Sequence, residues 1–512
     1  MARRLLQGLL GALSVALLAF LFLFRPWSCG DPPRIPQGFG HAWVSPFDGA
    51  PARARPLGGE RPPQHPWLAP NGASQMHGDA WASDTQAEPG PLGRSPEVVS
   101  AARGSIGGEC ATVAFDRRGR IVTVCANFAG MELLLLDPAS LRELARYPLP
   151  QRPSTRSLDL RRIVTDTSGG AYFYLDARDR AVLATSDHLI RVVALQDGPE
   201  GPAFHLERSY DLEPALAAAG FGDDPVVSTL PDWQGRHWFA TRHGLVGTVE
   251  RESGHVATRV LAGEEIQNSF AVDAEAMYIV SDHALYAFDA AEDGTPHVVW
   301  RETYDRGTRR KPGMIHQGSG TTPTVLPGGL VAIADNAEPR VQVLVYRTGR
   351  EAAGERLLCR VPVFEAGRSA TENSLVGFGR SLVVENNWGY DLFPLMTLGR
   401  SGAGGLARID VAEDGSGCRL VWSSDEVAQT VVPKLSLATG LLYIYTKSRR
   451  APPGVDPFYL TALDFRSGET VFRVLTGTGI GWDNHWAPVT LGRDGTAYVG
   501  ALRGLMAVRD RP

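Results

Sequence analysis

The sequence predicts an all-β protein: an eight-bladed β-propeller preceded by one N-terminal transmembrane helix. Two observations support the prediction of a propeller. A strand–turn–strand pattern recurs eight times along the chain, and the composition is typical of many short strands joined by tight turns. The 512 residues include 57 Gly and 36 Pro, whereas only 21% of the residues are charged. A seven-bladed ring is the alternative architecture.

The N-terminal segment, residues 1–25, is expected to be a membrane anchor. The basic sequence MARR precedes an uncharged apolar stretch at residues 5–24, which is about the length that a bilayer core requires. Arg25, Pro26 and Trp27 follow this stretch in place of a small-residue cleavage site, so an uncleaved anchor is favoured over a cleaved signal peptide. Because the basic end is retained inside, the rest of the chain is expected on the extracytoplasmic side of the cell membrane.

Residues 26–94 are rich in Pro and Gly and show no sustained period, which predicts a linker or an irregular collar. Beyond them, residues 95–512 are expected to form the propeller. Its last repeat has only three strands, because the chain ends soon after GLMAVRD. The segment SPEVVSAARG, residues 95–104, is therefore expected to supply the missing strand and close the ring.

Each repeat consists of a small or polar strand, a turn, and a second strand rich in Tyr, Val and Ile. A second pair of strands follows, as in YLTALDFRSGETVFRV from Tyr459, so each unit has four strands. The eight units begin at Cys110, Leu158, Val226, Asn268, Thr321, Asn373, Lys434 and Ala487.

These units, of the form L-x-A-L-D-x-x-S-G-x-x-V-F, resemble the repeat of the pyrroloquinoline-quinone-like (quinoprotein-type) β-propellers over residues 95–512. The resemblance implies eight blades. It implies no single activity, because the family contains both dehydrogenases and binding scaffolds. The chain lacks the vicinal Cys pair and the regular blade-docking Trp of the members that use the cofactor, which argues against quinone-dependent oxidation. The cofactor is left undetermined.

Cys110 and Cys125 flank a hairpin-like segment whose turn lies at Arg117 and Arg118. A tight turn there places the two thiols opposite each other, which predicts either a cross-strand disulfide or two buried free thiols. No C-x-x-C pair of the metal-ligand type occurs, so no structural zinc site is predicted. Asn, Asp and carbonyl groups of the channel could hold Ca²⁺, but no contiguous calcium-loop spacing occurs, so no metal site is assigned.

The first strand of every blade lines the central channel of a propeller, so polar residues near its start converge on the axis. The alternative is that they only hydrate a water-filled channel. The residues that the repeat alignment places there are Asp159, Ser228, Gln267, Asn268, Ser269, His316, Gln317, Thr321, Thr322, Glu372, Asn373, Ser374, Lys434, Asp483, Asn484 and His485.

Two loops rich in aromatic and polar residues, 385–390 and 481–486, indicate a ligand face. The candidates for ligand binding are Asn268, Gln317, Thr321, Thr322, Asn373, Asn387, Trp388, Asn484 and Trp486. The candidates for acid–base catalysis are His316, His485, Lys434, Glu372 and Asp483.

The net charge of -5 and the absence of a long basic run exclude a nucleic-acid footprint. No nucleophile elbow, zinc-protease motif, phosphate-binding loop or dinucleotide fingerprint is present. The favoured hypothesis is therefore a membrane-tethered propeller that binds a small ligand or a protein partner at its polar channel. The alternative is an extracytoplasmic hydrolase, lyase or oxidoreductase that acts on a small organic substrate.

Overall fold

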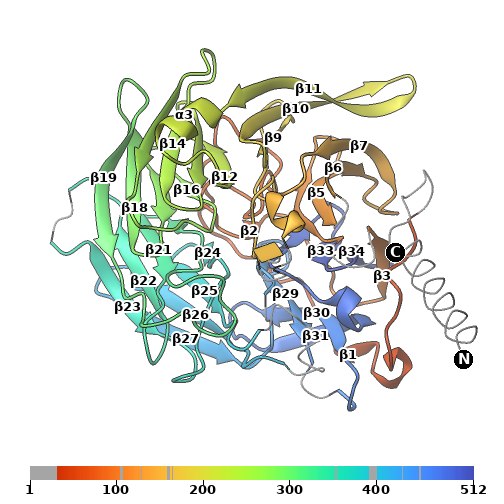
Figure 1. The fold of residues 1–512 in the computed structure, drawn as a ribbon. Coiled ribbons are helices and arrows are strands. Elements are labelled where there is room, and N and C mark those ends of the chain that lie inside the picture. The colour runs from red at the N-terminus through yellow and green to blue at the C-terminus, as the bar shows by residue number, and fades with distance from the viewer. Residues whose placement is uncertain are drawn as a thin grey trace, which may run out of the picture.

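The computed structural model describes residues 32–511 apart from 104–107, 128–129, 158, 160–161, 164, 352–353, 391–400, 429 and 449–450. The strands of these residues form eight sheets arranged as a ring (Figure 1), which confirms the eight-bladed β-propeller. The expected anchor, residues 1–25, lies outside the described residues. Within the described part of the chain, no helix is long and apolar enough to cross a bilayer.

The blades are numbered here in chain order, and the strands of each blade run from the axis outward. The strands of blades 1 to 4 are β4 (Cys110–Phe115), β5 (Ile121–Asn127), β6 (Gly130–Leu136), β7 (Glu143–Leu149); β8 (Tyr174–Leu175), β9 (Ala181–Ala184), β10 (Leu189–Gly198), β11 (Gly201–Asp211); β12 (Val226–Pro231), β13 (His237–Thr241), β14 (Leu245–Val249), β15 (Val256–Val260); β16 (Ala271–Val272), β17 (Met277–Val280), β18 (Ala284–Ala290) and β19 (Pro296–Thr303).

The strands of blades 5 to 8 are β20 (Thr324–Leu326), β21 (Leu330–Ala334), β22 (Gln342–Arg347), β23 (Leu357–Pro362); β24 (Val376–Phe378), β25 (Ser381–Glu385), β26 (Leu406–Val411), β27 (Cys418–Ser424); β28 (Lys434–Ser436), β29 (Leu441–Lys447), β30 (Pro457–Asp464), β31 (Thr470–Thr478); β32 (Val489–Leu491), β33 (Ala497–Ala501), β34 (Gly504–Asp510) and, from near the N-terminus, β3 (Pro96–Ala102). Blade 7 is extended by β1 (Phe47–Gly49) at its outer edge and by β2 (Thr85–Gln86) at the axis. The helices are η1 (His41–Trp43), η2 (Pro153–Arg156), α3 (Glu213–Ala218) and η3 (Ile480–Trp482).

Burial along the strands follows their place in the blade. Every residue of β13 and of β29 is buried, because strands near the axis are covered on both faces by the neighbouring blades. The outer strand β27 has one buried residue, Trp422. The sequence pattern thus changes from continuous apolar runs near the axis to largely exposed strands at the rim.

The turn between the first two strands of blades 1 to 3 is stabilised by an aspartate. In blade 1, Asp116 Oδ1 accepts hydrogen bonds from the backbone N–H groups of Arg118 (3.0 Å) and Arg120 (2.8 Å), and Oδ2 lies 2.7 Å from Arg120 Nε. Gly119 takes φ 79°, a left-handed conformation that glycine adopts without strain. Asp232 bonds the backbone N–H of Arg236 in the same way in blade 3.

This turn corrects the sequence prediction for blade 2. The repeat alignment began that unit at Leu158, but β8 begins at Tyr174. The turn is instead at Asp176, whose Oδ1 accepts the backbone N–H of Arg180 at 3.0 Å. The prediction was wrong by one strand, because the turn has Asp179 where blade 1 has glycine.

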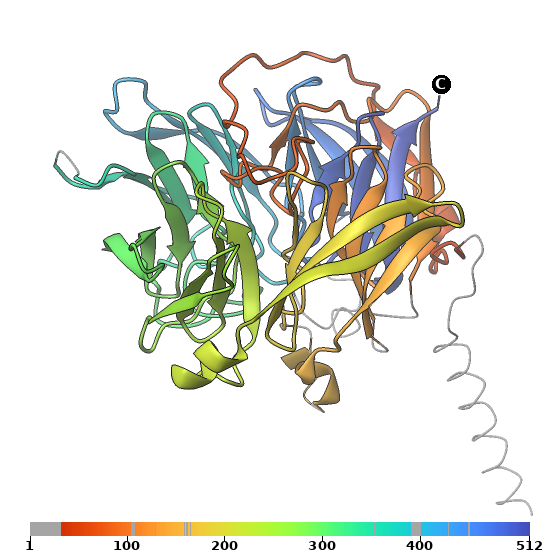
Figure 2. The same cartoon turned by 90° about the horizontal axis from the view of Figure 1, so that it is seen from above.

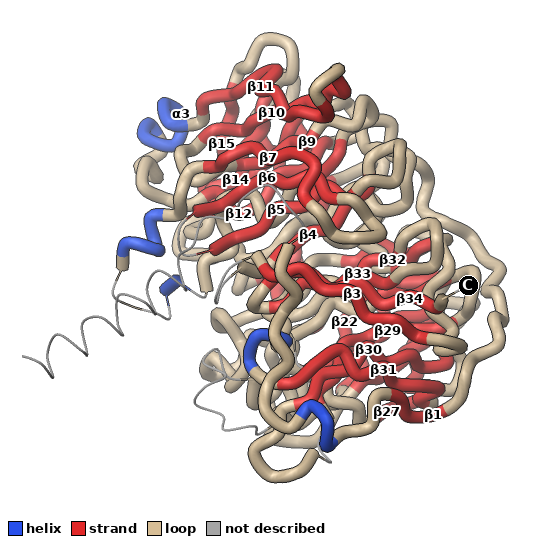
Figure 3. The backbone as a smooth tube through the Cα atoms, turned by 90° about the vertical axis from the view of Figure 1, so that its right-hand side faces the viewer, coloured by secondary structure: helices blue, strands red, loops and turns tan. Residues whose placement is uncertain are grey.

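The ring is closed by β3 and β34. The two strands are antiparallel, with Pro96 opposite Asp510 and Ala102 opposite Gly504, and they lie side by side in Figure 3. The pairing is the one that the three-stranded last repeat predicted, and it covers an otherwise exposed strand edge.

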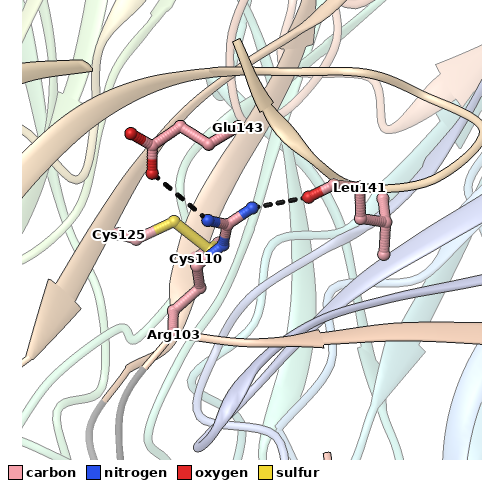
Figure 4. Close-up of a disulfide and its surroundings, with 5 residues drawn as sticks. All are labelled: Arg103, Cys110, Cys125, Leu141 and Glu143. Carbon is pink, nitrogen blue, oxygen red and sulfur yellow. Dashed lines mark hydrogen bonds and ion pairs between the residues drawn. A yellow bond between two sulfur atoms is a disulfide. The ribbon is translucent and has the colours of Figure 1, made fainter. Parts of the chain in front are cut away.

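Cys110 and Cys125 face each other across β4 and β5 and form a disulfide with a Cα–Cα distance of 4.0 Å. Of the two alternatives that the sequence left open, this is the cross-strand disulfide (Figure 4). Nearby, the Arg103 guanidinium donates to the Leu141 carbonyl oxygen at 2.6 Å. A second disulfide, Cys359–Cys418, joins the outer strands of blades 5 and 6 and was not predicted.

The outer hairpin of blade 2 is the longest of the molecule's described hairpins. Its strands, β10 and β11, have 10 and 11 residues, and the hairpin extends across the neighbouring blade in Figure 2. Arg120 of blade 1 holds the hairpin near its tip, through a 2.6 Å contact between its Nη1 and Asp197 Oδ1. The hairpin therefore ties blade 2 to blade 1.

The axis of the ring is occupied by residues 65–88, which we call the central segment. Its strand β2 lies at the middle of the ring in Figure 1 and is paired in parallel with β28. Ala80, Trp81 and Ser83 accept backbone hydrogen bonds from the inner strands of blades 4, 5 and 6 at 2.7, 2.9 and 2.8 Å. The sequence predicted a linker or collar here, whereas the structure places this segment inside the propeller.

The central segment contacts the remaining blades in the same manner. The further contacts are Asn71 Nδ2 to the Phe115 carbonyl oxygen (blade 1), Leu175 N to the Ser74 carbonyl oxygen (blade 2), Trp67 Nε1 to the Trp233 carbonyl oxygen (blade 3), Leu435 N to the Asp84 carbonyl oxygen (blade 7) and Leu491 N to Gln86 Oε1 (blade 8). Because the edge of each inner strand presents backbone groups toward the axis, the segment satisfies donors and acceptors that are otherwise left to water.

Candidate functional site

Apart from Asp159, the predicted channel residues discussed below divide into two sets, those that contact the central segment and those that surround one end of the ring. We call this end, where the inner strands begin, the entry end. It comprises residues 266–269, 314–322, 371–374, 385–390, 430–433 and 483–487. The opposite end carries the turns between the first two strands of each blade, and we call it the turn end.

Lys434, Thr322 and Ser374 belong to the first set. The Lys434 ammonium group forms an ion pair with Asp84 and donates to the Met76 carbonyl oxygen at 3.1 Å. Asp84 Oδ2 lies 3.0 Å from His77 Nδ1, and His77 Nε2 lies 3.1 Å from Thr322 Oγ1 and 3.4 Å from Ser374 Oγ. All five side chains are buried. The predicted catalytic lysine thus holds the central segment.

Glu372, His316 and Asn387 lie together at the entry end. Glu372 Oε1 accepts a hydrogen bond from the backbone N–H of Ile315 at 2.6 Å and lies 3.8 Å from His316 Nδ1. Asn387 Oδ1 accepts from the backbone N–H of Glu372 at 2.6 Å, so a residue after the second strand of blade 6 positions the start of the same blade. The structure therefore brings the three predicted residues of blades 5 and 6 together.

His485 and Trp486 form an aromatic cluster with Tyr390. The Tyr390 hydroxyl lies 3.0 Å from His485 Nδ1, and the rings of His485 and Trp486 have their centroids 4.1 Å apart. Tyr390 and Trp486 meet edge to face. The two loops that the sequence identified as a ligand face, 385–390 and 481–486, are thus in contact across the ring.

The carboxyl groups with raised pKa values here include one that the sequence analysis missed. Glu109, just before β4, accepts the backbone N–H of His485 at 2.8 Å, and burial raises its pKa well above the ordinary value. Burial also raises the pKa of Asp483 to about 7, although Lys447 opposes the shift. The pKa of Glu385 is raised well above its usual range by burial, against a hydrogen bond from Asn373.

Several of the predicted ligand-binding residues form hydrogen bonds within the protein itself. Asn484 Nδ2 donates to the carbonyl oxygens of Ala487 (2.9 Å) and Gly500 (2.8 Å). Gln317 donates to the Gly307 carbonyl oxygen at 2.8 Å, and Thr321 Oγ1 accepts the backbone N–H of Ala334 at 3.1 Å. Half-buried Trp388 donates its backbone N–H to Asn386 Oδ1 at 3.1 Å.

Asp159 was predicted to line the channel, but it is exposed in the connection between β7 and β8. This placement follows from the shift of one strand in blade 2. Tyr172 occupies the position before the inner strand of blade 2, and it forms an isolated parallel β-bridge with Ser228 of blade 3.

Other polar atoms of the entry end are buried without a hydrogen-bond partner among the described residues. They are Gln267 Nε2 and Oε1, Asn268 Nδ2, His316 Nδ1, Asn373 Oδ1, Glu385 Oε2 and Trp486 Nε1. An unsatisfied buried polar group costs about 1–3 kcal/mol, so a cluster of them at one end of a ring calls for a physical explanation. No group of three or more His, Cys, Asp or Glu placed to hold a metal ion occurs in the described residues.

No known family model matches the chain. An uncharacterised protein of Archaeoglobus fulgidus is 28% identical over 351 residues, which are 62% of this chain and 66% of that protein. The match therefore spans just under two thirds of the relative's length.

Similar folds occur among solved structures. Sqt1 of Chaetomium thermophilum, solved bound to the N-terminus of the ribosomal protein L10, has a TM-score of 0.50 and 13% identity, covering 80% of this chain and 98% of Sqt1. BamB of Moraxella catarrhalis has a TM-score of 0.48 and 13% identity, covering 78% of this chain and 95% of BamB. At such identity, the likeness to Sqt1 shows the fold alone.

Proposed function

We propose that this protein is a membrane-tethered, extracytoplasmic β-propeller that binds a small polar ligand at the entry end. The unpartnered atoms of Gln267, Asn268 and Asn373 carry the proposal. Amide groups both donate and accept hydrogen bonds, so these atoms suit a ligand with several hydroxyl or carbonyl groups. A small molecule is favoured over a protein partner because the atoms are buried between the loops.

The location rests on two features of the chain. The apolar stretch at residues 5–24 follows a basic start, as in a signal anchor. The two disulfides, Cys110–Cys125 and Cys359–Cys418, are typical of proteins that fold in an oxidising compartment. The repeat pattern supports a place among the pyrroloquinoline-quinone-like propellers.

A protein partner remains the other form of this binding function. The Sqt1 structure holds the N-terminus of a ribosomal protein, so a propeller of similar fold accepts a peptide. In this chain, a partner would contact the exposed parts of the loops at 385–390 and 481–486.

Thermal unfolding of the full chain in detergent against a library of small polar metabolites tests the proposal. A ligand at about 100 times its Kd stabilises the folded protein by about 2.7 kcal/mol, which raises the melting temperature by several degrees. Gln267→Leu and Asn373→Leu should abolish this rise while the unliganded protein still melts cooperatively. The exposed control Glu365→Gln should keep it. A ligand whose effect survives both leucine substitutions would contradict binding at the entry end.

The enzyme alternative has one specific observation in its favour. The His485 imidazole contacts the Tyr390 hydroxyl, the His485 backbone N–H donates to Glu109, and burial raises the pKa of neighbouring Asp483 to about 7, so several groups that can exchange protons lie together. The same samples separate the two functions. NMR spectra of an enzyme with its ligand show conversion that His485→Ala abolishes, whereas a binding protein leaves the ligand unchanged.

A further inference from the structure

The turn end of the ring contains a cavity of about 320 Å³. Residues 60–72 and 78–88 form most of its wall, and further lining residues come from the first turns of blades 5 and 6, from Leu437 of blade 7 and from Arg493 of blade 8. The cavity thus lies on the central segment itself. None of the predicted ligand-binding residues lines it, so it is distinct from the site at the entry end.

His65 places an unused hydrogen-bond donor beside this cavity. Its side chain is buried, and its Nδ1 accepts a hydrogen bond from the backbone N–H of Trp67 at 3.2 Å. Burial lowers the pKa of His65 to about 4, so the ring is neutral at pH 7 and its single proton is on Nε2. Nε2 has no partner among the described residues.

Trp81 and Glu88 add a second donor and an acceptor. Both line the cavity, and Trp81 Nε1 and Glu88 Oε2 are buried without a partner in the described part of the chain. A Cβ atom at Gly72 would lie 3.2 Å from Glu88 Oε2, so any larger residue at this position would crowd the carboxyl group. The Phe378 ring completes the lining with an apolar surface.

The charges around the cavity disfavour a charged ligand of either sign. Glu60, Asp79 and Glu88 oppose an anion, and Arg61 and Arg493 oppose a cation. A hydroxyl group both donates and accepts, so a neutral polyhydroxylated molecule can satisfy the two N–H donors and the carboxyl oxygen together. Aromatic rings suit the apolar C–H faces of such a molecule.

We propose that the cavity at the turn end binds a neutral monosaccharide through His65, Trp81 and Glu88. Its volume is at the lower end of the range of about 300–1,000 Å³ that ligand pockets occupy, which favours one sugar ring over an oligosaccharide. This site is independent of the ligand proposed for the entry end.

Isothermal titration of the full chain with glucose, galactose, mannose and N-acetylglucosamine tests the proposal. The protein is held in a detergent without a sugar head group, so that the detergent does not compete. At least one sugar should bind, and Trp81→Phe and Glu88→Gln should each weaken its binding about tenfold, since the first removes the N–H donor and the second replaces a charged acceptor by a neutral amide. The exposed controls Trp43→Phe and Glu365→Gln should leave the affinity unchanged.

Absence of binding by all four sugars, an affinity unchanged in both cavity variants, or tighter binding of glucuronate than of glucose would overturn the proposal. Gln267→Leu, at the opposite end of the ring, separates this site from the proposed function. It should leave sugar binding intact whether or not the entry end holds a ligand.

Discussion

Lys434 and Asp84 are separated by 350 positions in the sequence and form an ion pair at the centre of the ring. The side chains are 1% and 0% exposed, so water does not screen the pair. A buried ion pair contributes little net stability compared with apolar residues, because both charges lose their hydration. Removing one partner is nevertheless strongly destabilising, since the other charge is then left buried and uncompensated.

Lys434→Met should therefore lower the free energy of unfolding by about 3–5 kcal/mol. Urea denaturation measures the effect, and the double variant Lys434→Met with Asp84→Asn should recover at least half of it because neither charge remains. Arg117→Met breaks an exposed ion pair with Asp179 and serves as the matched control, with an expected change of less than about 1 kcal/mol. A change as small as the control's in Lys434→Met would show that the pair does not hold the central segment.

At the scale of the element, β3 has the clearest role. It is the outermost strand of blade 8, and its residues Pro96–Ala102 cover the whole length of β34. Without it, β34 would present a row of unpaired backbone groups at the seam of the ring.

Replacing residues 95–102 by a Gly/Ser sequence of the same length should broaden thermal unfolding, lower its midpoint, and promote association of the protein through β34. Calorimetry and size-exclusion chromatography measure these effects. The same replacement at residues 412–417, the turn between β26 and β27, is the control and should leave a cooperative transition. If the β3 replacement also melts as a single sharp transition at the original temperature, β3 does not close the ring.

The whole molecule contains buried carboxyl groups that make its stability depend on pH. Burial raises the pKa of Asp79 to about 6 and of Asp335 and Asp483 to about 7, from the ordinary value of 3.8. In the unfolded chain, these groups ionise near pH 4. The folded state retains their protons up to their higher pKa values, so it binds more protons than the unfolded state between about pH 4 and pH 7.

The contribution of these carboxyl groups to the free energy of unfolding should therefore decrease as the pH rises from about 4 to about 7, while buried His65, whose pKa is lowered to about 4, contributes in the opposite direction. Asp483→Asn should flatten this decrease and should stabilise the protein more at pH 8 than at pH 5, because the amide stays neutral. Denaturation at a series of pH values measures both effects. Asp293→Asn, at a fully exposed position, is the control and should leave the slope unchanged. A slope that Asp483→Asn also leaves unchanged would contradict the raised pKa.

Local patterns in the sequence were sufficient for the eight blades, because strand alternation and turn residues recur within each unit and depend on neighbouring residues alone. The closing strand also followed from counting, since a ring with a three-stranded last blade has an open edge. The sequence could offer a disulfide between Cys110 and Cys125 as one of two alternatives, because the two residues lie on adjacent strands of one hairpin. Blade 2 shows the limit of this method, because Asp179 stands in its turn where blade 1 has Gly119.

Only the tertiary structure could decide what fills the axis of the ring. The central segment has no period because its hydrogen-bond partners belong to all eight blades, and each partner imposes its own geometry. The same reason explains why the ion pair of Lys434 with Asp84, the Cys359–Cys418 disulfide and the contact of Glu109 with His485 were missed. Their partners lie far away in the sequence, and only the closed ring brings them into contact.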